Sequence, residues 1–246
     1  MNLSIISTGS QGNCYILSNE KEAIIIECGV NIKSIKKDLD FDLSKVVGCI
    51  LTHEHLDHAK SIKEVMSSGI EVYASAGTHI ARGTDKSHRA RTLINKVPVK
   101  IGGFKVLPFD VKHDAAEPMG FLINHKETGN LLFLTDTYYS PYKFANLNNI
   151  IIEANFSQEI IDRKVAEGVS QEFLRNRILQ SHLSLENCID LLDVNDLTAV
   201  NNIVLIHLSD TNSHEANFKK CVEINTGKNV TVARNNMKIN LKKNPF

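Results

Sequence analysis

Three histidines and two acids lie within six consecutive positions, His53 to His58, in the stretch LTHEHLDHAK. In an extended segment, residues two apart project to the same side, so His53 and His55 can bind one ion from one face. Asp57 and His58 follow where the chain is expected to turn into a helix, and they can point at a second position nearby. Imidazole and carboxylate groups without a thiolate are typical of Zn²⁺, Mn²⁺ or Fe sites and differ from a structural cysteine-type zinc site. The stretch therefore predicts a pair of metal ions.

Further ligands must come from later in the chain, because these side chains are too few to hold two ions. Three candidates stand at the ends of predicted strands: His113 in VKHDAAEP, Asp136 in LLFLTDTYY and His207 in IVLIHLSD. Ligands that follow strands on one edge of a sandwich converge on a single cleft. Each residue taken alone is more often a hydrogen-bonded histidine or a turn aspartate than a metal ligand. In combination with HEHLDH, they predict one metal cleft.

The cluster lies between a predicted buried strand and a predicted helix. The apolar run VVGCIL is typical of a buried strand, and helical spacing resumes from His58 to Met66. Upstream, short β-type runs separated by STGSQGN and SNEKE predict an opening meander, and Ile32 to Leu39 has helical spacing. The meander strands are expected at 3–6, 15–17 and 23–26.

The rest of the chain has a second β-rich block and then alternates helices with strands. Strands grouped early and late, with helices between and outside them, predict an α/β fold of two sheets with helices on their outer faces. No repeat or long linker interrupts the pattern, so we expect one domain over residues 1–246. The expected elements are strands at 70–73, 97–111, 120–123, 131–134 and 150–155, helices at 158–179 and 185–192, a strand in NNIVLIHLSD, a helix at 214–222 and a closing hairpin in VTVARNNMKINL.

The composition is that of an ordinary globular chain. Of the 246 residues, 42% are hydrophobic and 23% are charged, and the formal net charge is zero. No global field therefore attracts nucleic acid or anionic lipid, which argues against a large nucleic-acid partner without excluding one. The N-terminus lacks a signal-peptide pattern, and no window approaches the roughly 18 apolar residues of a membrane span. We expect a cytoplasmic protein whose five scattered cysteines are reduced.

The metal-ligand pattern resembles that of a known superfamily. HxHxDH in HEHLDH, followed by the lone His113, Asp136 and His207, resembles the metallo-β-lactamase superfamily over nearly the whole chain. The resemblance implies an αββα four-layer sandwich. The stretches TGSQGNCYIL, SHLSLEN and HLSD resemble its phosphodiesterase and nuclease-like branch, which includes RNase Z and the YycJ-type proteins. The chain is also similar to phage anti-Pycsar phosphodiesterases, which destroy cyclic mononucleotides.

The resemblance implies a role for each candidate residue. Asp57 would orient the attacking water, and His182 in QSHLSLEN matches the histidine with which RNase Z-like enzymes protonate the leaving oxygen. Asp136 stands where a thiolate-containing β-lactamase has a cysteine, so it argues against that type of enzyme. It does not separate phosphodiesterases from thioester hydrolases. Zn²⁺ is the preferred ion and Mn²⁺ the alternative. The implied ligands are His53, His55 and His113 for the first ion, Asp57, His58 and His207 for the second, and Asp136 as the bridge.

Two departures from the family pattern stand near the expected cleft. Glu27 in IIIECG replaces the usual aspartate, so its longer side chain would support the ligands from a slightly different position. Tyr138 and Tyr139 follow Asp136, where the family tends to have glycine, and they bring bulk or a stacking surface. Neither departure removes a predicted ligand.

The expected activity is two-metal hydrolysis of a phosphodiester. The neutral charge and the lack of an added clamp favour a small substrate, with 3′,5′-cyclic nucleotides as the favoured class and phage counter-defence as the role. The alternatives are a YycJ-like 5′ exonuclease or RNA-processing nuclease, a thioester or lactone hydrolase, and a non-enzymatic nucleotide-binding protein. The basic stretch Lys86 to Lys96 fits either a phosphate-binding surface or a solvated face. The resemblance also implies a homodimer.

Overall fold

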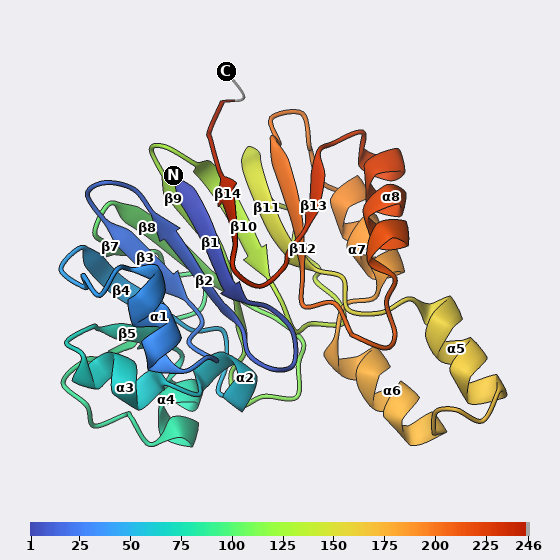
Figure 1. Cartoon of the computed structure of the whole chain (residues 1–246), viewed down its shortest axis with the longest axis horizontal. Coiled ribbons are helices and arrows are strands. Elements are labelled where there is room, and N and C mark those ends of the chain that lie inside the picture. Colours follow the sequence, from blue (N-terminus) through green and yellow to red (C-terminus); the bar gives the residue numbers. More distant parts are fainter. Residues whose placement is uncertain (245–246) are drawn as a thin grey trace.

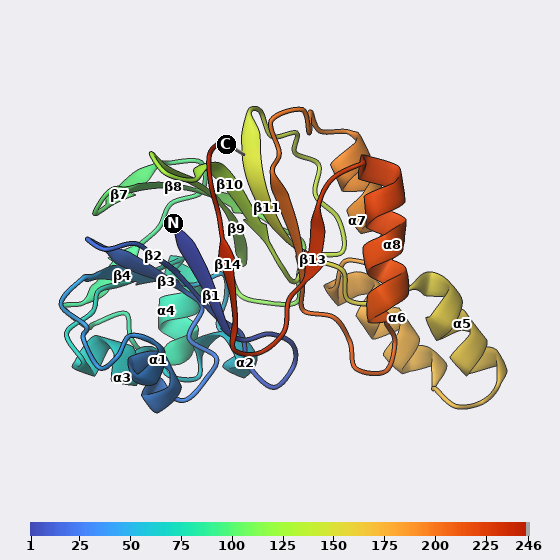
Figure 2. The same cartoon turned by 45° about the horizontal axis from the view of Figure 1, so that its top comes forward.

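Two seven-stranded mixed sheets pack face to face in the computed structural model, which describes residues 1–244. Helices cover the outer face of each sheet, so the layers run helix, sheet, sheet, helix (Figures 1 and 2). The α/β four-layer sandwich expected from the sequence is therefore confirmed. No helix within the described residues is long and apolar enough to cross a bilayer.

The first sheet is built mainly from the N-terminal part of the chain. Its opening strands form the antiparallel meander that the sequence predicts, and the strands that follow pair in parallel. One strand from the C-terminus completes the sheet by pairing with β1. In spatial order the strands are β14 (Met237–Asn240), β1 (Asn2–Ser7), β2 (Cys14–Ser18), β3 (Ala23–Ile26), β4 (Val46–Ile50), β5 (Val72–Ala74) and β6 (Ala90–Thr92).

The second sheet contains the strands that precede the later site residues. The strands that come first in the sequence pair antiparallel, and the later strands pair in parallel. In spatial order the strands are β13 (Val230–Val232), β12 (Asn202–Ile206), β11 (Leu147–Glu153), β10 (Gly129–Leu134), β9 (Met119–His125), β8 (Phe104–Asp110) and β7 (Val99–Ile101).

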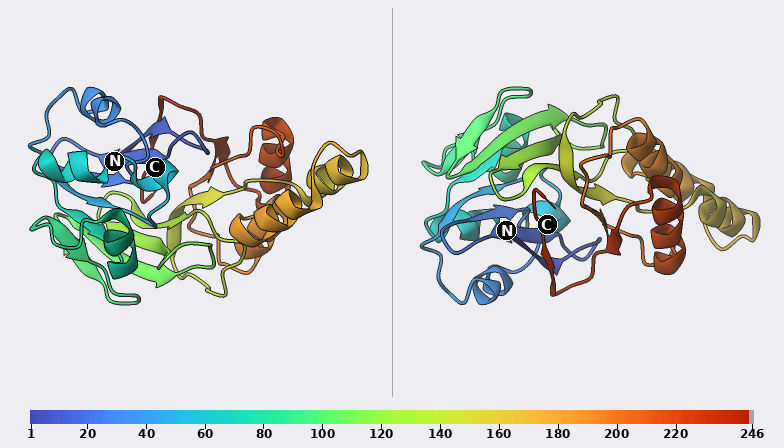
Figure 3. Two further views of the ribbon diagram at one scale, coloured as in Figure 1. Left: turned by 90° about the horizontal axis from the view of Figure 1, so that it is seen from below. Right: turned by 90° about the horizontal axis from the view of Figure 1, so that it is seen from above.

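The helices divide into two outer layers and a projecting pair. Figure 3 shows one group beside the first sheet, another beside the C-terminal side of the second sheet, and a helical hairpin that extends beyond the sandwich. The first group is α1 (Ile32–Asp38), α2 (Leu56–Ala59), α3 (Ile62–Ser67) and α4 (Ala76–Arg82), the second is α7 (Leu185–Asp193) and α8 (Glu215–Thr226), and the hairpin is α5 (Gln158–Ala166) and α6 (Glu172–Ser181).

The continuous apolar runs of the central strands arise because both of their faces are buried. Ile24 and Ile26 of β3 face the core between the sheets, whereas Ile25 faces the core beneath the outer helices. Ile151 of β11 likewise joins the central core, and its neighbours join the core under α7 and α8. Helix-covered strands in parallel pairs are expected to read as unbroken apolar runs. Tyr15 and Phe133 connect the sheets with ring centroids 5.4 Å apart.

The closing hairpin predicted in VTVARNNMKINL is wrong. β13 pairs with β12 in the second sheet, and β14 pairs with β1 in the first. The segment therefore crosses between the sheets. Apolar alternation identifies each strand but not its partner, and here the open sheet edges provide the partners.

The helical pattern also differs from the expectation at several places. The expected helix over 158–179 is interrupted, because Gly168 has a φ of 70° at the end of α5 and α6 begins only at Glu172. The expected helix over 58–66 is two short helices, α2 and α3. Helix α4 and strand β6 lie in segments for which the sequence predicts no regular element.

The predicted site residues gather where strands of the two sheets end. The HEHLDH loop follows β4, and three separate loops follow β8, β10 and β12. The pairing makes β8, β10, β11 and β12 run in one direction, so their carboxyl ends share an edge. Ligands commonly bind outside the carboxyl ends of strands in α/β sheets. The topology therefore provides one edge for all the candidate ligands.

Gly29 lets the meander approach the HEHLDH loop closely. Its N–H donates to the carbonyl oxygen of Asn13 at 2.9 Å, and the N–H of Asn13 donates to that of Asp57 at 2.7 Å. A Cβ at position 29 would lie 1.7 Å from the carbonyl oxygen of Asp57. This oxygen belongs to the backbone and cannot rotate away, so a residue without a side chain is required.

We expect Gly29→Ala to lower the free energy of unfolding by about 1–3 kcal/mol, because the added methyl group must push the Asp57 backbone aside. Denaturant unfolding followed by circular dichroism measures this change. Lys33→Ala, on the exposed side of α1, is the control and should stay within about 0.5 kcal/mol of the wild type. A Gly29→Ala protein as stable as the control would contradict the close approach.

Candidate metal centre

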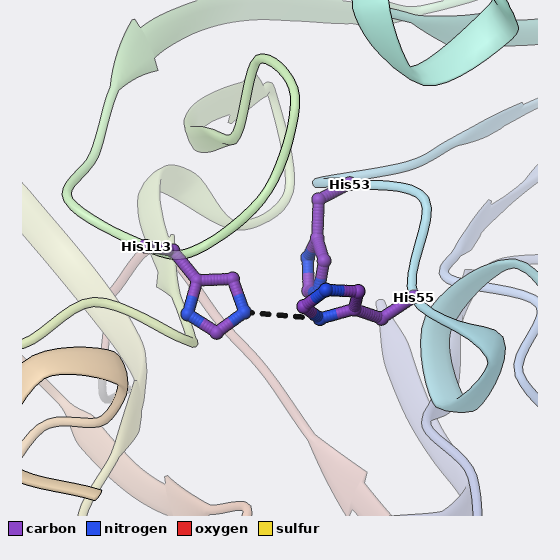
Figure 4. A group of neighbouring side chains, drawn as sticks. All are labelled: His53, His55 and His113. Atoms are coloured by element: carbon purple, nitrogen blue, oxygen red, sulfur yellow. Dashed lines mark hydrogen bonds between the residues drawn. The ribbon is translucent and has the colours of Figure 1, made fainter. Parts of the chain in front are cut away.

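His53, His55 and His113 form a group of imidazoles that face one another (Figure 4). Their ligand nitrogens lie within 4.8 Å of one another, and Nε2 of His113 lies 3.1 Å from Nδ1 of His55. His53 is buried, and the side chain of His113 is only 3% exposed, whereas His55 is a partly exposed residue. Nitrogens this close can bind one ion at the usual distance of about 2.0–2.1 Å.

Asp57, His58 and His207 form a second group, whose donor atoms also lie within 4.8 Å of one another. Oδ2 of Asp57 lies 3.3 Å from Nε2 of His58 and 3.6 Å from Nε2 of His207. Asp136 stands beside this group, with Oδ2 at 2.9 Å from Nε2 of His58, and it also forms a group with His53 and His58. The structure thus brings together all the side chains that the sequence singles out as ligands, with Asp136 between the two groups.

Hydrogen bonds on the outer side of the rings determine which nitrogen faces the cluster. Nδ1 of His53 lies 2.9 Å from Oγ1 of Thr52, and Nδ1 of His207 lies 2.8 Å from Oε1 of Glu153. The Nε2 atoms of His53 and His207 are buried and have no hydrogen-bond partner among residues 1–244. A buried nitrogen without a partner is costly, and a ring held at Nδ1 with a free Nε2 is typical of a metal ligand. The residues present therefore fit divalent metal ions.

The acids of the site create a field that attracts cations. Burial lowers the pKa of His53 well below its usual value, which keeps this imidazole neutral as a ligand must be. Burial alone would lower the pKa of His207, but Asp136, Asp57 and Glu153 outweigh burial and raise it to about 9. Because a bound cation displaces such a proton, the same carboxylates would favour metal binding.

Glu153 is a functional candidate that the sequence analysis did not single out. It is fully buried at the end of β11, and its Oε1 lies 2.8 Å from Nδ1 of His182 and 2.8 Å from Nδ1 of His207. Its Oε2 accepts a hydrogen bond from the N–H of Leu183 at 3.1 Å. A charged residue that ends the isoleucine run IIIE was the available signal, because a buried carboxylate needs hydrogen-bond donors.

His182 lies beside the predicted ligands. Its Nδ1 lies 2.8 Å from Glu153 and 3.0 Å from Oδ1 of Asp136. Burial would lower the pKa of His182, but Glu153 and Asp136 outweigh it and raise the pKa to about 11. With Nδ1 occupied, Nε2 is the nitrogen available to a bound molecule.

Three non-glycine residues of the site have left-handed backbone conformations. The φ angles are 64° at Glu27, 48° at Asp136 and 55° at His207. Each residue follows shortly after a strand, so the sharp turn directs its side chain across the sheet edge. Glu27 accepts a hydrogen bond from the N–H of Thr52 at 3.2 Å, and its Oε1 lies 3.7 Å from Nδ1 of His58. The longer carboxylate of Glu27 thus supports the HEHLDH loop.

A cavity of about 480 Å³ opens over the cluster. One wall is α6, with Leu174, Arg177 and Ile178, and another is the loop after His207. The volume lies within the range of about 300–1,000 Å³ typical of small-molecule sites. Its polar floor is formed by His55, Asp57, His113, Asp136, His182 and His207.

The basic stretch Lys86 to Lys96 contributes nothing to the lining of this cavity. Arg91 pairs with Glu71 and with nearby carbonyl groups, and Arg89 donates to the carbonyl oxygen of Gly69 at 2.7 Å. These contacts support the solvated-face interpretation of the stretch.

Comparison with known proteins identifies the family. Residues 7–136 match the profile of the Metallo-beta-lactamase superfamily, so the matched part contains HEHLDH, His113 and Asp136. The chain belongs to the metallo-β-lactamase superfamily of hydrolases. The family expected from the sequence is therefore confirmed.

Named relatives are similar to this chain at low identity. Exodeoxyribonuclease WalJ of Streptococcus pneumoniae is 27% identical over 227 residues, covering 85% of this chain and 82% of that protein. Exodeoxyribonuclease YycJ of Bacillus anthracis is 26% identical over 174 residues, covering 65% of each chain. The crystal structure of human tRNase Z, short form, superposes with a TM-score of 0.65 at 17% identity, over 98% of this chain and 99% of that one, and so shares the fold. The likeness to phage anti-Pycsar enzymes stays a prediction.

We expect Glu153→Gln to weaken metal binding by about 10- to 100-fold, because the neutral amide cannot hold His207 in the same orientation and charge state. Competition with a chelating dye measures the affinity. Glu159→Gln, at the exposed start of α5, is the control and should bind metal as the wild type does. Unchanged affinity in a folded Glu153→Gln protein would contradict the role of this carboxylate.

Proposed function

We propose that this chain is a metal-dependent phosphodiesterase that acts on nucleotides. The observation that carries the proposal is the position of His182 beside two groups of metal donors that meet at Asp136. Such a site can hold two cations and, next to them, a histidine free to act on a leaving group. The predicted ligands are His53, His55, Asp57, His58, His113, Asp136 and His207, with Zn²⁺ as the preferred ion and Mn²⁺ as the alternative.

Two bound divalent ions would supply a water of lowered pKa and positive charge against the phosphoryl oxygens. Asp57, which lines the cavity and is partly exposed, orients the attacking water through its carboxylate. Burial would raise the pKa of Asp57, but the nearby rings of His207 and His58 outweigh burial and lower this pKa, so the carboxylate stays ionised at neutral pH. It therefore accepts a hydrogen bond from the water and aligns it with the phosphorus atom.

His182 donates the proton that the leaving oxygen requires. The carboxylates of Glu153 and Asp136 hold a proton on this ring, and Nε2 can deliver it to a molecule in the cavity. General acids contribute about 10²- to 10⁴-fold to such reactions. Glu153 then stabilises the position of the ring through the hydrogen bond to Nδ1.

We propose 3′,5′-cyclic nucleotides as the favoured substrates, with phage-type counter-defence as the role. The cavity of about 480 Å³ over the donors is of a size to hold a small ligand, and the chain has no net charge to attract a polymer. A homodimer and a cytoplasmic location, both expected from the sequence, stay predictions.

A 5′ exonuclease is the second candidate. The relative that matches over most of both chains carries the name exodeoxyribonuclease WalJ, and the same donor groups can cleave a polymer. Cyclic mononucleotides and end-labelled single-stranded DNA or RNA, each incubated with metal-loaded protein, separate the two candidates. Cleavage of the polymers alone would replace the favoured substrate by nucleic acid.

We expect Asp57→Ala to reduce hydrolysis of bis-p-nitrophenyl phosphate by at least about 10²-fold, because the water loses its orienting carboxylate. Release of p-nitrophenolate measures the rate, and Asp85→Ala, in an exposed turn, is the control.

A strong chelator should abolish the activity, and restoration by Zn²⁺ or by Mn²⁺ identifies the working ion. Full activity in Asp57→Ala or in chelator would disprove the proposed site.

We expect His182→Ala to slow substrates with poor alkoxide leaving groups far more than activated aryl esters. Nitrophenolate leaves without protonation, whereas an alkoxide needs the proton of a general acid. Rates on a cyclic nucleotide and on bis-p-nitrophenyl phosphate give the comparison, with the exposed His88→Ala as the control. An equal loss on both substrates would show that His182 is not the acid.

A further inference from the structure

A second cavity of about 1,020 Å³ adjoins the metal cleft. The two cavities have His113, Asp114, Arg177 and Ser181 in common. Arg177 stands at this boundary, with Nε 4.0 Å from Oδ2 of Asp114 and a side chain that is 72% exposed. A molecule whose phosphate lies over the metal donors can therefore extend into the second cavity past this exposed cationic side chain.

Two exposed aromatic rings line the second cavity. Phe173 is 64% exposed and Tyr138 is 38% exposed. Amide side chains of α6, Asn176 and Gln180, line the same cavity, as does Lys112. Aromatic rings stack on nucleobases, and amides and cations bind base edges and phosphates. The lining is therefore suited to a nucleobase.

Both aromatic walls are attached to the metal cleft. Tyr138 follows Asp136 by two residues, its N–H donates to the carbonyl oxygen of Lys112 at 3.2 Å, and its carbonyl oxygen accepts from Nδ2 of Asn187 at 2.9 Å. Phe173 belongs to α6, whose last residue, Ser181, provides a carbonyl oxygen 2.8 Å from Nδ1 of His113. These contacts connect the walls of the second cavity to the metal donors, although α5 and α6 project from the sandwich (Figures 1 and 3).

We propose that this second cavity is the base-binding subsite for the nucleoside attached to the scissile phosphate, with Tyr138 and Phe173 stacking on the base. The proposal rests on the proposed phosphodiesterase function and names the part of the substrate that the chain recognises. It applies equally to a cyclic mononucleotide and to the terminal nucleotide of a strand. Base stacking on an aromatic ring contributes enough to change affinity by roughly 5- to 150-fold.

A matched substrate pair tests the subsite. Thymidine 5′-p-nitrophenyl phosphate and methyl p-nitrophenyl phosphate release the same leaving group, and only the first carries a base. Phe173→Ala and Tyr138→Ala should raise KM for the thymidine ester by roughly 5- to 150-fold. Their kcat for both esters and their KM for the methyl ester should stay unchanged. Phe173→Tyr should retain the affinity, and Phe41→Ala, at an aromatic residue that is 73% exposed outside both cavities, is the control.

Binding without turnover gives a second measurement. Titration calorimetry with thymidine 5′-monophosphate and with inorganic phosphate on metal-loaded protein should show that Phe173→Ala weakens only the nucleotide. Equal effects on the nucleotide and on phosphate, or no effect on either, would overturn the subsite. Wild-type protein that binds the nucleotide more tightly than phosphate but hydrolyses neither ester would overturn the proposed function and leave the subsite supported.

Discussion

The buried carboxylate of Glu153 is the contact on which the arrangement of the site most depends. One oxygen of Glu153 faces Nδ1 of both His182 and His207, and the other accepts a backbone N–H from the segment that carries His182. A buried charge is tolerated only where donors surround it, so the carboxylate holds β11, β12 and the start of α7 in one geometry. The same contact turns the Nε2 atom of His207 toward the predicted metals and leaves Nε2 of His182 for the substrate.

Similar contacts recur around the cluster, and together they create a preorganised site. Thr52 holds the ring of His53, Ser181 holds that of His113, and Glu27 lies beside that of His58. The hydrogen bonds to His53 and His113 are made at Nδ1, where they set the direction of each ring, and the carboxylate of Glu27 lies 3.7 Å from Nδ1 of His58. Left-handed backbone at Asp136 and His207 adds local strain that the surrounding sheets must offset. The two-sheet core, with its apolar residues on both faces of each central strand, provides that stability.

The cleft combines a general part with a part particular to this chain. The donors of the HEHLDH loop, His113 and Asp136 lie within the part of the chain that matches the superfamily, and they leave the substrate open. The walls above the donors come from α6 and from Tyr138, two residues after Asp136, and in our proposal they bind the base. The proposed chemistry and the proposed base recognition therefore lie on different elements, in line with the rule that one fold can carry different functions.

Much of the fold and of the candidate site could be predicted from the sequence. The HEHLDH spacing, the lone His113, Asp136 and His207 after apolar runs, and the unbroken strands with their meander are local patterns, and local patterns are what the order of residues encodes directly. Only the tertiary structure decided which strands became neighbours. VTVARNNMKINL was therefore mistaken for a hairpin, although its two strands join different sheets.

The same limit applies to the residues that support the site. Glu153 was missed because its partners, His182 and His207, are 29 and 54 residues away in the chain, and no spacing rule connects them. Tyr138 was recognised as a stacking surface, but its neighbour in the second cavity, Phe173, is 35 residues away in the chain, and no spacing rule connects the two. Residue type and short spacing determined which side chains can bind a metal. Only the folded chain determined how each one is oriented, because orientation depends on contacts between segments that are distant in sequence.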